Sequence, residues 1–191
     1  MRQPDLDRVP RLTTARLTLR RFEEGDLDAL VVVLSDSEVA RHLGNDGAVP
    51  SRTEVWRALA AYLGHWALRG YGPFAVEEQA TGRLVGRVGL WRPEGWPELE
   101  LIWTVARDRW GRDYAGEAAR AAREWAGAAL GPVRIVSYIR PTNGRSRRVA
   151  AKLGARQDGE VVLMGATAEV WLHPVVAGQP ARPTPTGASS P

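Results

Sequence analysis

The stretch from Glu98 to Leu130 constrains the fold more than any other part of the chain. It opens with alternating side chains, Leu99 and Leu101 pointing one way and Glu98 and Glu100 the other, which is the pattern of a β-strand. A basic turn follows, and the alanine-rich segment after it predicts a helix. Because the first amides of a helix lack intrahelical partners and carry partial positive charge, this strand–turn–helix unit is a predicted anion-binding site.

The rest of the chain alternates strand and helix patterns. Ser51 and Glu54 form a capping-box pattern at one helix start, and a helix begun at Thr142 or Asn143 should end at Gly154. Strands are expected at 12–22, 74–78, 84–91, 98–105 and 133–139 and as two short strands before 173, and helices at 26–34, 37–43, 51–68 and 115–130. We therefore predict an α/β (α+β) fold with a single mixed, mostly antiparallel central sheet and helices on both faces.

Length and composition favour one soluble domain. The chain has 191 residues, and no apolar run approaches membrane-spanning length. We expect a flexible leader at 1–11, the folded domain at 12–173 and a disordered tail rich in Pro, Gly and Ser at 174–191. The leader lacks the apolar core of a secretory signal, so the cytoplasm is the expected location and no membrane partner is expected.

The charged and metal-ligating residues exclude several classes of function. The chain has no cysteine, and its three histidines show no metal-ligand spacing, so no metal site is expected. The net charge is +4, but the basic residues are spread along the chain and only Lys152 is a lysine. This spread is more typical of a genome-wide compositional preference than of a nucleic-acid-binding surface. We therefore expect no specific nucleic-acid partner. A ribosome- or nucleic-acid-associated binding protein remains the least favoured alternative.

The segment WGRDYAGEA, from Trp110 to Ala118, resembles motif A of the GNAT superfamily of N-acetyltransferases. In the branch that acetylates ribosomal-protein N-termini, this segment often reads WG-x-GYA-x-EA, and its turn amides hold the pyrophosphate of acetyl-CoA. Asp113 stands here in place of the family's glycine. Aspartate tolerates a left-handed backbone, but it brings a negative charge near two phosphates. The plainer alternative is a helix that starts after a polar turn.

A second segment, PTNGRSRRVAAKLGA from Pro141 to Ala155, resembles motif B of the same family. The phrases T-x-R-L-x-L-R from Thr14 and G-x-L-V-G-x-V-G-L from Gly82 also resemble family patterns, so the resemblance covers about residues 12 to 173. It implies the GNAT fold and an acetyl-CoA-dependent acyltransferase that moves an acetyl group to a primary amine. Direct attack in a ternary complex is expected, because the sequence offers no cysteine and no evident serine–histidine pairing.

The resemblance also implies an acetyl-CoA site. Val105 and Arg107 match the positions that contact the pantetheine amides, and Asn143 matches one on the pantetheine or thioester side. The positions that match the pyrophosphate turn are Arg109, Trp110, Gly111, Arg112, Asp113, Tyr114 and Ala115. The residues that could reach the 3′-phosphate are Arg148 and Lys152. The last two are equally compatible with solvated surface charges.

Glu100 is the candidate general base, because the family often places a catalytic glutamate on this strand and a partly closed cleft would raise its pKa. Glu98 is its rival on the same strand face. Many relatives use a tyrosine acid seven residues after the motif B asparagine, where this chain has Ala150. Ser146 is therefore the candidate acid, or else a helix-capping hydroxyl, and Tyr138 ranks third. Backbone amides at an expected bulge near residues 104–106 would meet the oxyanion.

The acceptor is expected to be a primary amine, either a protein N-terminus or a small molecule such as an antibiotic or metabolite. Trp91, Trp96 and Trp103, with Glu98, are candidates for an aromatic-lined acceptor site that contacts the amine through cation–π interactions. The loop at 44–50 commonly borders this site in the family. A non-catalytic acyl-CoA-binding module is the second alternative, prompted by Asp113 and Ala150. The oligomeric state is left open, with a homodimer among the options.

Overall fold

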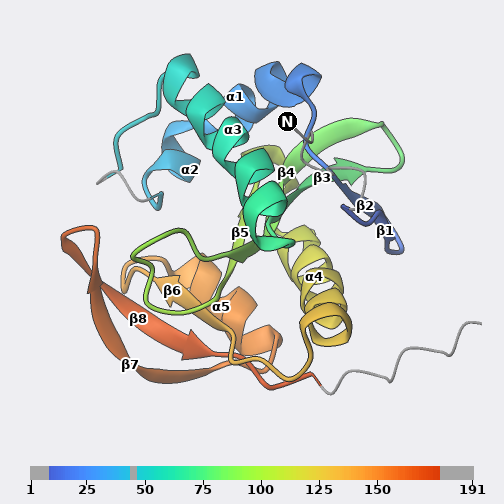
Figure 1. Ribbon diagram of the computed structural model, residues 1–191. Coiled ribbons are helices and arrows are strands. Elements are labelled where there is room, and N and C mark those ends of the chain that lie inside the picture. The colour runs from blue at the N-terminus through green and yellow to red at the C-terminus, as the bar shows by residue number, and fades with distance from the viewer. Residues whose placement is uncertain (1–8, 44–46, 177–191) are drawn as a thin grey trace, which may run out of the picture.

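The computed structural model describes residues 9–43 and 47–176, which form one eight-stranded mixed sheet with helices on both faces (Figure 1). The strand order is β1-β2-β3-β4-β5-β6-β8-β7, and the one parallel pair is β5–β6. The strands are β1 (Leu12–Thr13), β2 (Leu17–Arg20), β3 (Pro73–Glu78), β4 (Arg83–Trp91), β5 (Glu100–Val105), β6 (Val136–Ile139), β7 (Arg156–Leu163) and β8 (Ala166–Leu172). The helices are α1 (Leu27–Leu34), α2 (Ser37–Ala40), α3 (Arg52–Arg69), α4 (Tyr114–Leu130) and α5 (Gly144–Lys152). The predicted fold class is confirmed.

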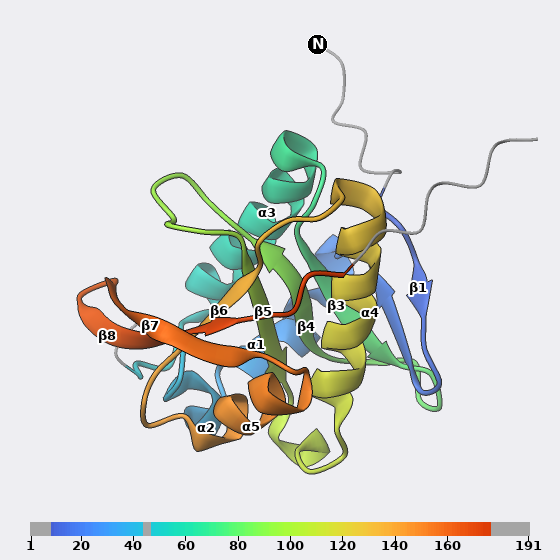
Figure 2. The same cartoon turned by 90° about the horizontal axis from the view of Figure 1, so that it is seen from below.

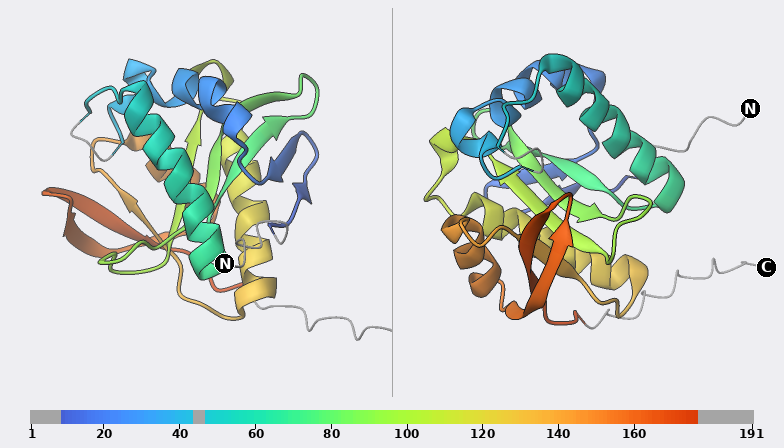
Figure 3. Two further views of the ribbon diagram at one scale, coloured as in Figure 1. Left: turned by 45° about the horizontal axis from the view of Figure 1, so that its top comes forward. Right: turned by 90° about the vertical axis from the view of Figure 1, so that its left-hand side faces the viewer.

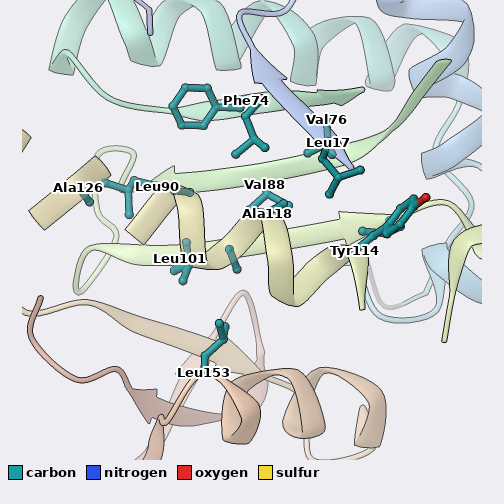
Figure 4. Close-up of a cluster of buried hydrophobic side chains, with 14 of the residues drawn as sticks. Leu17, Phe74, Val76, Val88, Leu90, Leu101, Tyr114, Ala118, Ala126 and Leu153 are labelled. Atoms are coloured by element: carbon teal, nitrogen blue, oxygen red, sulfur yellow. The ribbon is translucent and has the colours of Figure 1, made fainter. Parts of the chain in front are cut away.

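The helices cover the two faces of the sheet in separate groups. α1 and α3 pack on the face formed by β3 and β4, and α4 and α5 lie on the opposite face (Figure 3). Ala118, Ala122 and Ala126 of α4 are fully buried, and Ala118 lies beside Val88 and Leu101 in the core (Figure 4). Small side chains on this face let the helix backbone approach the sheet closely, as the alanine-rich pattern predicted.

The predicted helix caps are confirmed. Ser51 and Glu54 form the capping box of α3. The Asn143 side chain caps α5 by accepting a hydrogen bond from the Ser146 N–H (3.1 Å), and Gly154 follows the helix with a φ of +79°. These contacts are local in sequence, which is why the sequence alone could predict them.

Several predicted strand limits are wrong. The strand expected at 12–22 is broken into β1 and β2 by a turn, where Thr14 Oγ1 and the Arg16 N–H both bond the Glu117 carboxylate of α4 (2.5 and 2.9 Å). The strands expected from residues 98 and 133 begin at Glu100 and Val136. The last two strands are a longer hairpin of 8 and 7 residues rather than short strands, and Figure 2 shows it at the end of the sheet opposite β1.

The sheet opens between β5 and β6. These strands share a single registered pair, Glu100 with Val136, whereas β5 pairs continuously with β4 on its other edge. Beyond that pair the two strands part toward their carboxyl ends. The chain then enters α4 after β5 and α5 after β6, so both helix N-termini lie at the open end of the gap.

Some predictions fall outside the described part of the chain. These are residues 1–8 of the expected leader, 44–46 of the expected acceptor loop and 177–191 of the expected tail. Within the described residues, no helix is long and apolar enough to cross a membrane.

Candidate active site

A cleft of about 630 Å³ occupies the opening between β5 and β6. Its walls come from α2, β4 and the loop after it, β5, β6, the turn before α4, one face of α5 and the tip of the β7–β8 hairpin. It brings together most of the predicted site residues, namely Trp91, Trp96, Glu100, Trp103, Val105, Arg109, Trp110, Gly111, Asp113, Tyr114, Ala115, Asn143, Ser146, Arg148 and Lys152. The predicted residues Glu98, Arg107 and Arg112 do not line it.

Glu100 lies in the cleft where β5 and β6 part. It is only 7% exposed, and its carboxylate accepts hydrogen bonds from the Trp96 indole N–H (2.9 Å) and the Tyr138 backbone N–H (3.3 Å). Burial raises the pKa of Glu100 to about 7, although these two bonds and the charge of Arg87 act in the opposite direction. A carboxylate with this pKa can accept a proton near neutral pH and release it again.

Ser146 lies on the opposite wall, in the first turn of α5. Its hydroxyl oxygen accepts a hydrogen bond from the Trp103 indole N–H at 3.2 Å. The cap of α5 comes from Asn143, so the Ser146 hydroxyl is not the cap. Its own proton therefore remains available to a group in the cleft.

A serine–histidine pair that the sequence did not reveal lies in the wall of the cleft. Ser137 Oγ is 2.9 Å from His173 Nε2 and donates its proton to the Leu101 carbonyl at 2.6 Å. His173 must then donate to Ser137, so it cannot act as a base toward that serine. Burial lowers the pKa of His173 to about 4, which keeps it neutral. The expectation of no such pairing is wrong, but this pair ties β6 to β5 and supplies no activated nucleophile.

The turn before α4 has the geometry of an anion site. Gly111 has a φ of +80° and Asp113 a φ of +59°, so the predicted left-handed backbone at Asp113 is present. The Glu117 N–H is the first in α4 to reach a helical carbonyl, that of Asp113 (2.9 Å). The amides of the three residues before it therefore have no intrahelical partner and lie beside the cleft.

The Asp113 carboxylate lies over the first turn of α4. A Cβ atom on Gly116 would come within 2.8 Å of it. Arg120 donates to one oxygen (3.0 Å) and Lys152 lies 3.4 Å from the other. Burial acts to raise the pKa of Asp113, but these two cations hold it below its ordinary value. The cations that pair with Asp113 therefore come from α4 and α5.

Arg109 lines the cleft, but its guanidinium is bound to a carboxylate that does not line it. Its guanidinium binds both oxygens of the buried Glu78 carboxylate (3.0 and 2.9 Å), and the Tyr114 hydroxyl donates to the same group (2.7 Å). These bonds, led by Arg109, lower the pKa of Glu78 to about 2. Arg109 and Tyr114 thus fasten the turn to β3. These side-chain contacts give Arg109 and Tyr114 a structural role, and the binding of pyrophosphate by the turn that contains them stays a prediction.

Three further predicted residues lie outside the cleft. Glu98 forms an ion pair with Arg134 and does not line the cleft. Its position therefore supports neither of the roles predicted for it, the alternative base and a contact to the acceptor. The Arg107 side chain is 59% exposed and its nearest carboxylate is Asp36 at 4.0 Å. Arg112 is exposed. Side chains on a turn diverge, so a motif that fixes their backbone does not fix where their charges point.

The expected bulge near residues 104–106 is absent. β5 pairs with β4 in one register from Glu100 to Val105, and register shifts lie instead between Val76 and Glu77 of β3 and between Gln157 and Glu160 of β7. The Val105 carbonyl, a predicted pantetheine contact, already accepts the Trp110 indole N–H at 2.9 Å. Ala150, which replaces the family's tyrosine, is fully buried and does not line the cleft.

The sequence reading missed several residues that line the cleft. Arg145 stacks over the Trp110 ring, 4.2 Å from its centroid, and lies on the same wall as Arg148 and Lys152. The spacing of these three along α5 places them on one helix face, a signal that the sequence did contain. Other cleft residues carry no local signal, because they come together only in the fold. They are Glu38, Val39, His42, Leu43, Leu163 and Met164.

Known proteins are similar to this chain in both sequence and fold. The chain matches the acetyltransferase (GNAT) domain family over residues 16–156. It is 27% identical over 148 residues to the uncharacterized N-acetyltransferase YnaD of Bacillus subtilis (strain 168), covering 78% of this chain and 84% of that protein. It is 31% identical over 153 residues to the uncharacterized protein YkkB of the same organism, covering 75% and 84%.

Solved structures agree. An acetyltransferase from Agrobacterium tumefaciens str. C58 superimposes with a TM-score of 0.77 at 29% identity, over 86% of this chain and 94% of that one. The ribosomal L7/L12 alpha-N-protein acetyltransferase RimL, solved with coenzyme A, gives 0.71 at 17% identity over 88% and 98%, a likeness of fold alone. Because the family match spans well over half of the chain, this protein belongs to the GNAT family and is an N-acetyltransferase.

Proposed function

We propose that this enzyme transfers an acetyl group from acetyl-CoA to a primary amine by direct attack in a ternary complex, with Glu100 as the general base. The observation that carries this proposal is the buried Glu100 carboxylate, whose pKa is raised to about 7 in a cleft that continues to the N-terminus of α4. One cleft thus holds a proton acceptor and an anion site, the two functions that acetyl transfer to an ammonium group requires.

The proton transfers are assigned to groups on opposite walls. Glu100 takes a proton from the ammonium form of the acceptor, while the bonds from Trp96 and Tyr138 hold the carboxylate in place. The thioester supplies the acetyl group and a thiolate leaving group. Ser146 donates its proton toward that thiolate, because Trp103 already occupies its acceptor side and orients the hydroxyl, and the second proton that the amine nitrogen loses as the amide forms restores the hydroxyl.

The chain's groups for holding acetyl-CoA fit an elongated anion. The free amides at the start of α4 suit the pyrophosphate, as a helix N-terminus does in general. The cations come from α5 rather than from the turn, because Arg109 is bound to Glu78 whereas Arg145, Arg148 and Lys152 line the cleft. Asn143 Oδ1 caps α5, which leaves its amide N–H₂ to donate toward the pantetheine side.

The acceptor amine enters beside Trp91 and Trp96, whose rings line the cleft near Glu100. A protein N-terminus and a small amine both satisfy this chemistry. The non-catalytic alternative has less support, because it gives no reason for burying Glu100 at the cleft. The nucleic-acid alternative has less support too, since arginines such as Arg20, Arg109 and Arg134 are held in ion pairs with carboxylates.

The test is Glu100→Gln, with Glu98→Gln as the matched control. Glutamine keeps the shape of the side chain but cannot take the proton, so kcat should fall by about 10²–10⁴-fold with little change in acetyl-CoA affinity. The loss should shrink as pH rises, because more of the amine is then neutral in solution. Glu98→Gln should stay close to wild type, since Glu98 lies outside the cleft. Thiol release across a panel of amines gives the readout, and full activity of Glu100→Gln would remove Glu100 from the mechanism.

A further inference from the structure

The walls of the cleft around Glu100 are largely apolar and aromatic. They come from α2, β4 and the loop after it, β6 and the tip of the β7–β8 hairpin, and Figures 1 and 3 show α2 and that tip on the same side of the molecule. We call these side chains the acceptor wall: Val39, Leu43, Trp91, Trp96, Tyr138, Leu163 and Met164. Apolar walls of this kind favour a ligand with an apolar body, because burying that body removes its surface from water.

Met164 is held in a conformation that its residue type rarely adopts. It has a φ of +51° in the two-residue turn of the β7–β8 hairpin, before Gly165 with a φ of +79°. Such turns favour asparagine or glycine at both positions. Met164 is 57% exposed and nonetheless lines the cleft. A flexible apolar side chain kept at a strained position beside an active site points to a role in contacting ligand.

The carboxylates of the cleft restrict the charge of the acceptor. Among the described residues, those that line it are Glu38, Glu100 and Asp113. Glu38 is ion-paired with Arg41, and Asp113 is held by Arg120 and Lys152. Glu100 accepts hydrogen bonds from the neutral Trp96 and Tyr138 groups, so it alone of the three has no cation hydrogen-bonded to it. The described cleft therefore offers one place for an ammonium group, and Arg145 in the same wall repels a second cation.

Resting on the acetyl transfer proposed above, we propose that the acceptor is a monocationic primary amine attached close to an aromatic or branched apolar group, and that Met164 is a specificity-determining contact for that group. The ammonium lies at Glu100 and the apolar group against the acceptor wall. The proposal excludes polyamines and other polycations, because their further charges would enter an apolar wall in which the described residues offer no second unpaired carboxylate. Small arylalkylamines and peptides that begin with an apolar residue share the required chemistry.

The first test measures acceptor binding without turnover, by calorimetry in the presence of coenzyme A. The probes are 2-phenylethylamine, a tripeptide beginning with phenylalanine, ethylamine and spermidine. We expect 2-phenylethylamine or the tripeptide to bind at least about tenfold more tightly than ethylamine, and spermidine to gain nothing over ethylamine. Whichever of the two aromatic probes binds more tightly identifies the source. Tightest binding of spermidine, or equal binding of all four probes, would overturn the proposal.

The second test uses Met164→Gly, with Val162→Ala as its control. Glycine suits the left-handed turn, so the hairpin should keep its fold and its melting temperature while the wall loses one side chain. The affinity for the aromatic probe should fall by about fivefold or more, and that for ethylamine should not change. Val162 is on the same hairpin, is 72% exposed and does not line the cleft, so its variant should match wild type. Equal effects of the two variants would remove Met164 from the proposal.

Failure of this inference and failure of the proposed activity give different results. If no amine releases thiol from acetyl-CoA but 2-phenylethylamine still binds selectively, the acetyl-transfer proposal fails and the binding selectivity stands. If thiol is released with every amine at similar kcat/KM, the activity stands and the selectivity is wrong.

Discussion

Glu100 carries an energetic cost that follows from its position. Its pKa rises from an ordinary 4.5 to about 7 because burial disfavours the charged form. The native state therefore holds this proton at pH values where the unfolded chain has released it. The contribution of Glu100 to the free energy of unfolding therefore falls as pH rises from about 4.5 to about 7, and above that range its full cost is present.

This predicts a pH-dependent difference between wild type and Glu100→Gln. Glutamine does not ionise, so the variant does not lose stability in this way. The difference in the free energy of unfolding, variant minus wild type, should therefore increase by about 3 kcal/mol between pH 4.5 and pH 8. Chemical denaturation at several pH values measures this difference. Parallel stability curves for the two proteins would mean that the carboxylate ionises with an ordinary pKa.

Asp113 places a negative charge at the anion-binding end of α4 and occupies Arg120 and Lys152. Asp113→Asn keeps a residue that tolerates the left-handed backbone and removes only the charge. We expect it to tighten acetyl-CoA binding by about fivefold, or about 1 kcal/mol, because repulsion at a helix N-terminus is relieved. Calorimetric titration measures the affinity.

Asp113→Gly separates charge from backbone geometry at this position. It removes the same charge and also relieves the φ of +59°. If both variants tighten binding equally, charge is the cause. Weaker binding by both would mean that Asp113 holds Lys152 and Arg120 where the cofactor needs them.

At the scale of elements, the turn before α4 is held by a buried ion pair to β3. Removing the Arg109 guanidinium leaves the Glu78 carboxylate, only 5% exposed, without its cation. Arg109→Met should therefore lower the melting temperature, because the Glu78 carboxylate would lose the cation that pairs with it. Arg145→Ala should leave the melting temperature nearly unchanged and weaken acetyl-CoA binding, because Arg145 lines the cleft and forms no ion pair with a described carboxylate. The opposite pattern in melting and titration experiments would restore Arg109 as the phosphate ligand.

The elements themselves were largely predictable, because their signals are local. The capping box at Ser51, the cap at Asn143 and the alanine face of α4 each depend on residues a few positions apart. Strand limits were less predictable. Residues 133–135 alternate like a strand, but β6 begins only at Val136, where a neighbouring strand offers hydrogen bonds. The partner of Arg109 was not predictable, since Glu78 lies 31 positions away in the sequence.

At the scale of the whole molecule, the predicted site residues come together where the backbone position decides where a residue lies. Glu100, Ser146 and the turn at 110–115 meet in one cleft because β5 and β6 are adjacent and both lead into helices at the same end. The acceptor wall could not be predicted in this way. α2 and the β7–β8 hairpin reach the cleft from segments more than a hundred residues apart, and no pattern in either one refers to the other.

Acetyl-CoA should raise the melting temperature of the folded chain. A ligand that binds only the native state at ten times its Kd stabilises it by about 1.4 kcal/mol. Thermal denaturation with and without acetyl-CoA measures the shift, and dephospho-CoA serves as a comparison for cations that bind the 3′-phosphate. No shift at millimolar acetyl-CoA would contradict the assignment of the cleft.

The separation of β5 and β6 bears on how the acceptor specificity of an enzyme of this shape could change. Glu100, the proposed proton acceptor, belongs to one side of the separation, while Ser146 and the hairpin with Met164 belong to the other. If both proposals hold, mutations that reshape the hairpin tip will alter which amine is accepted without disturbing the strand that carries the proton acceptor. Such an arrangement would let new acceptors be acquired at the rim of the cleft while the chemistry is inherited unchanged.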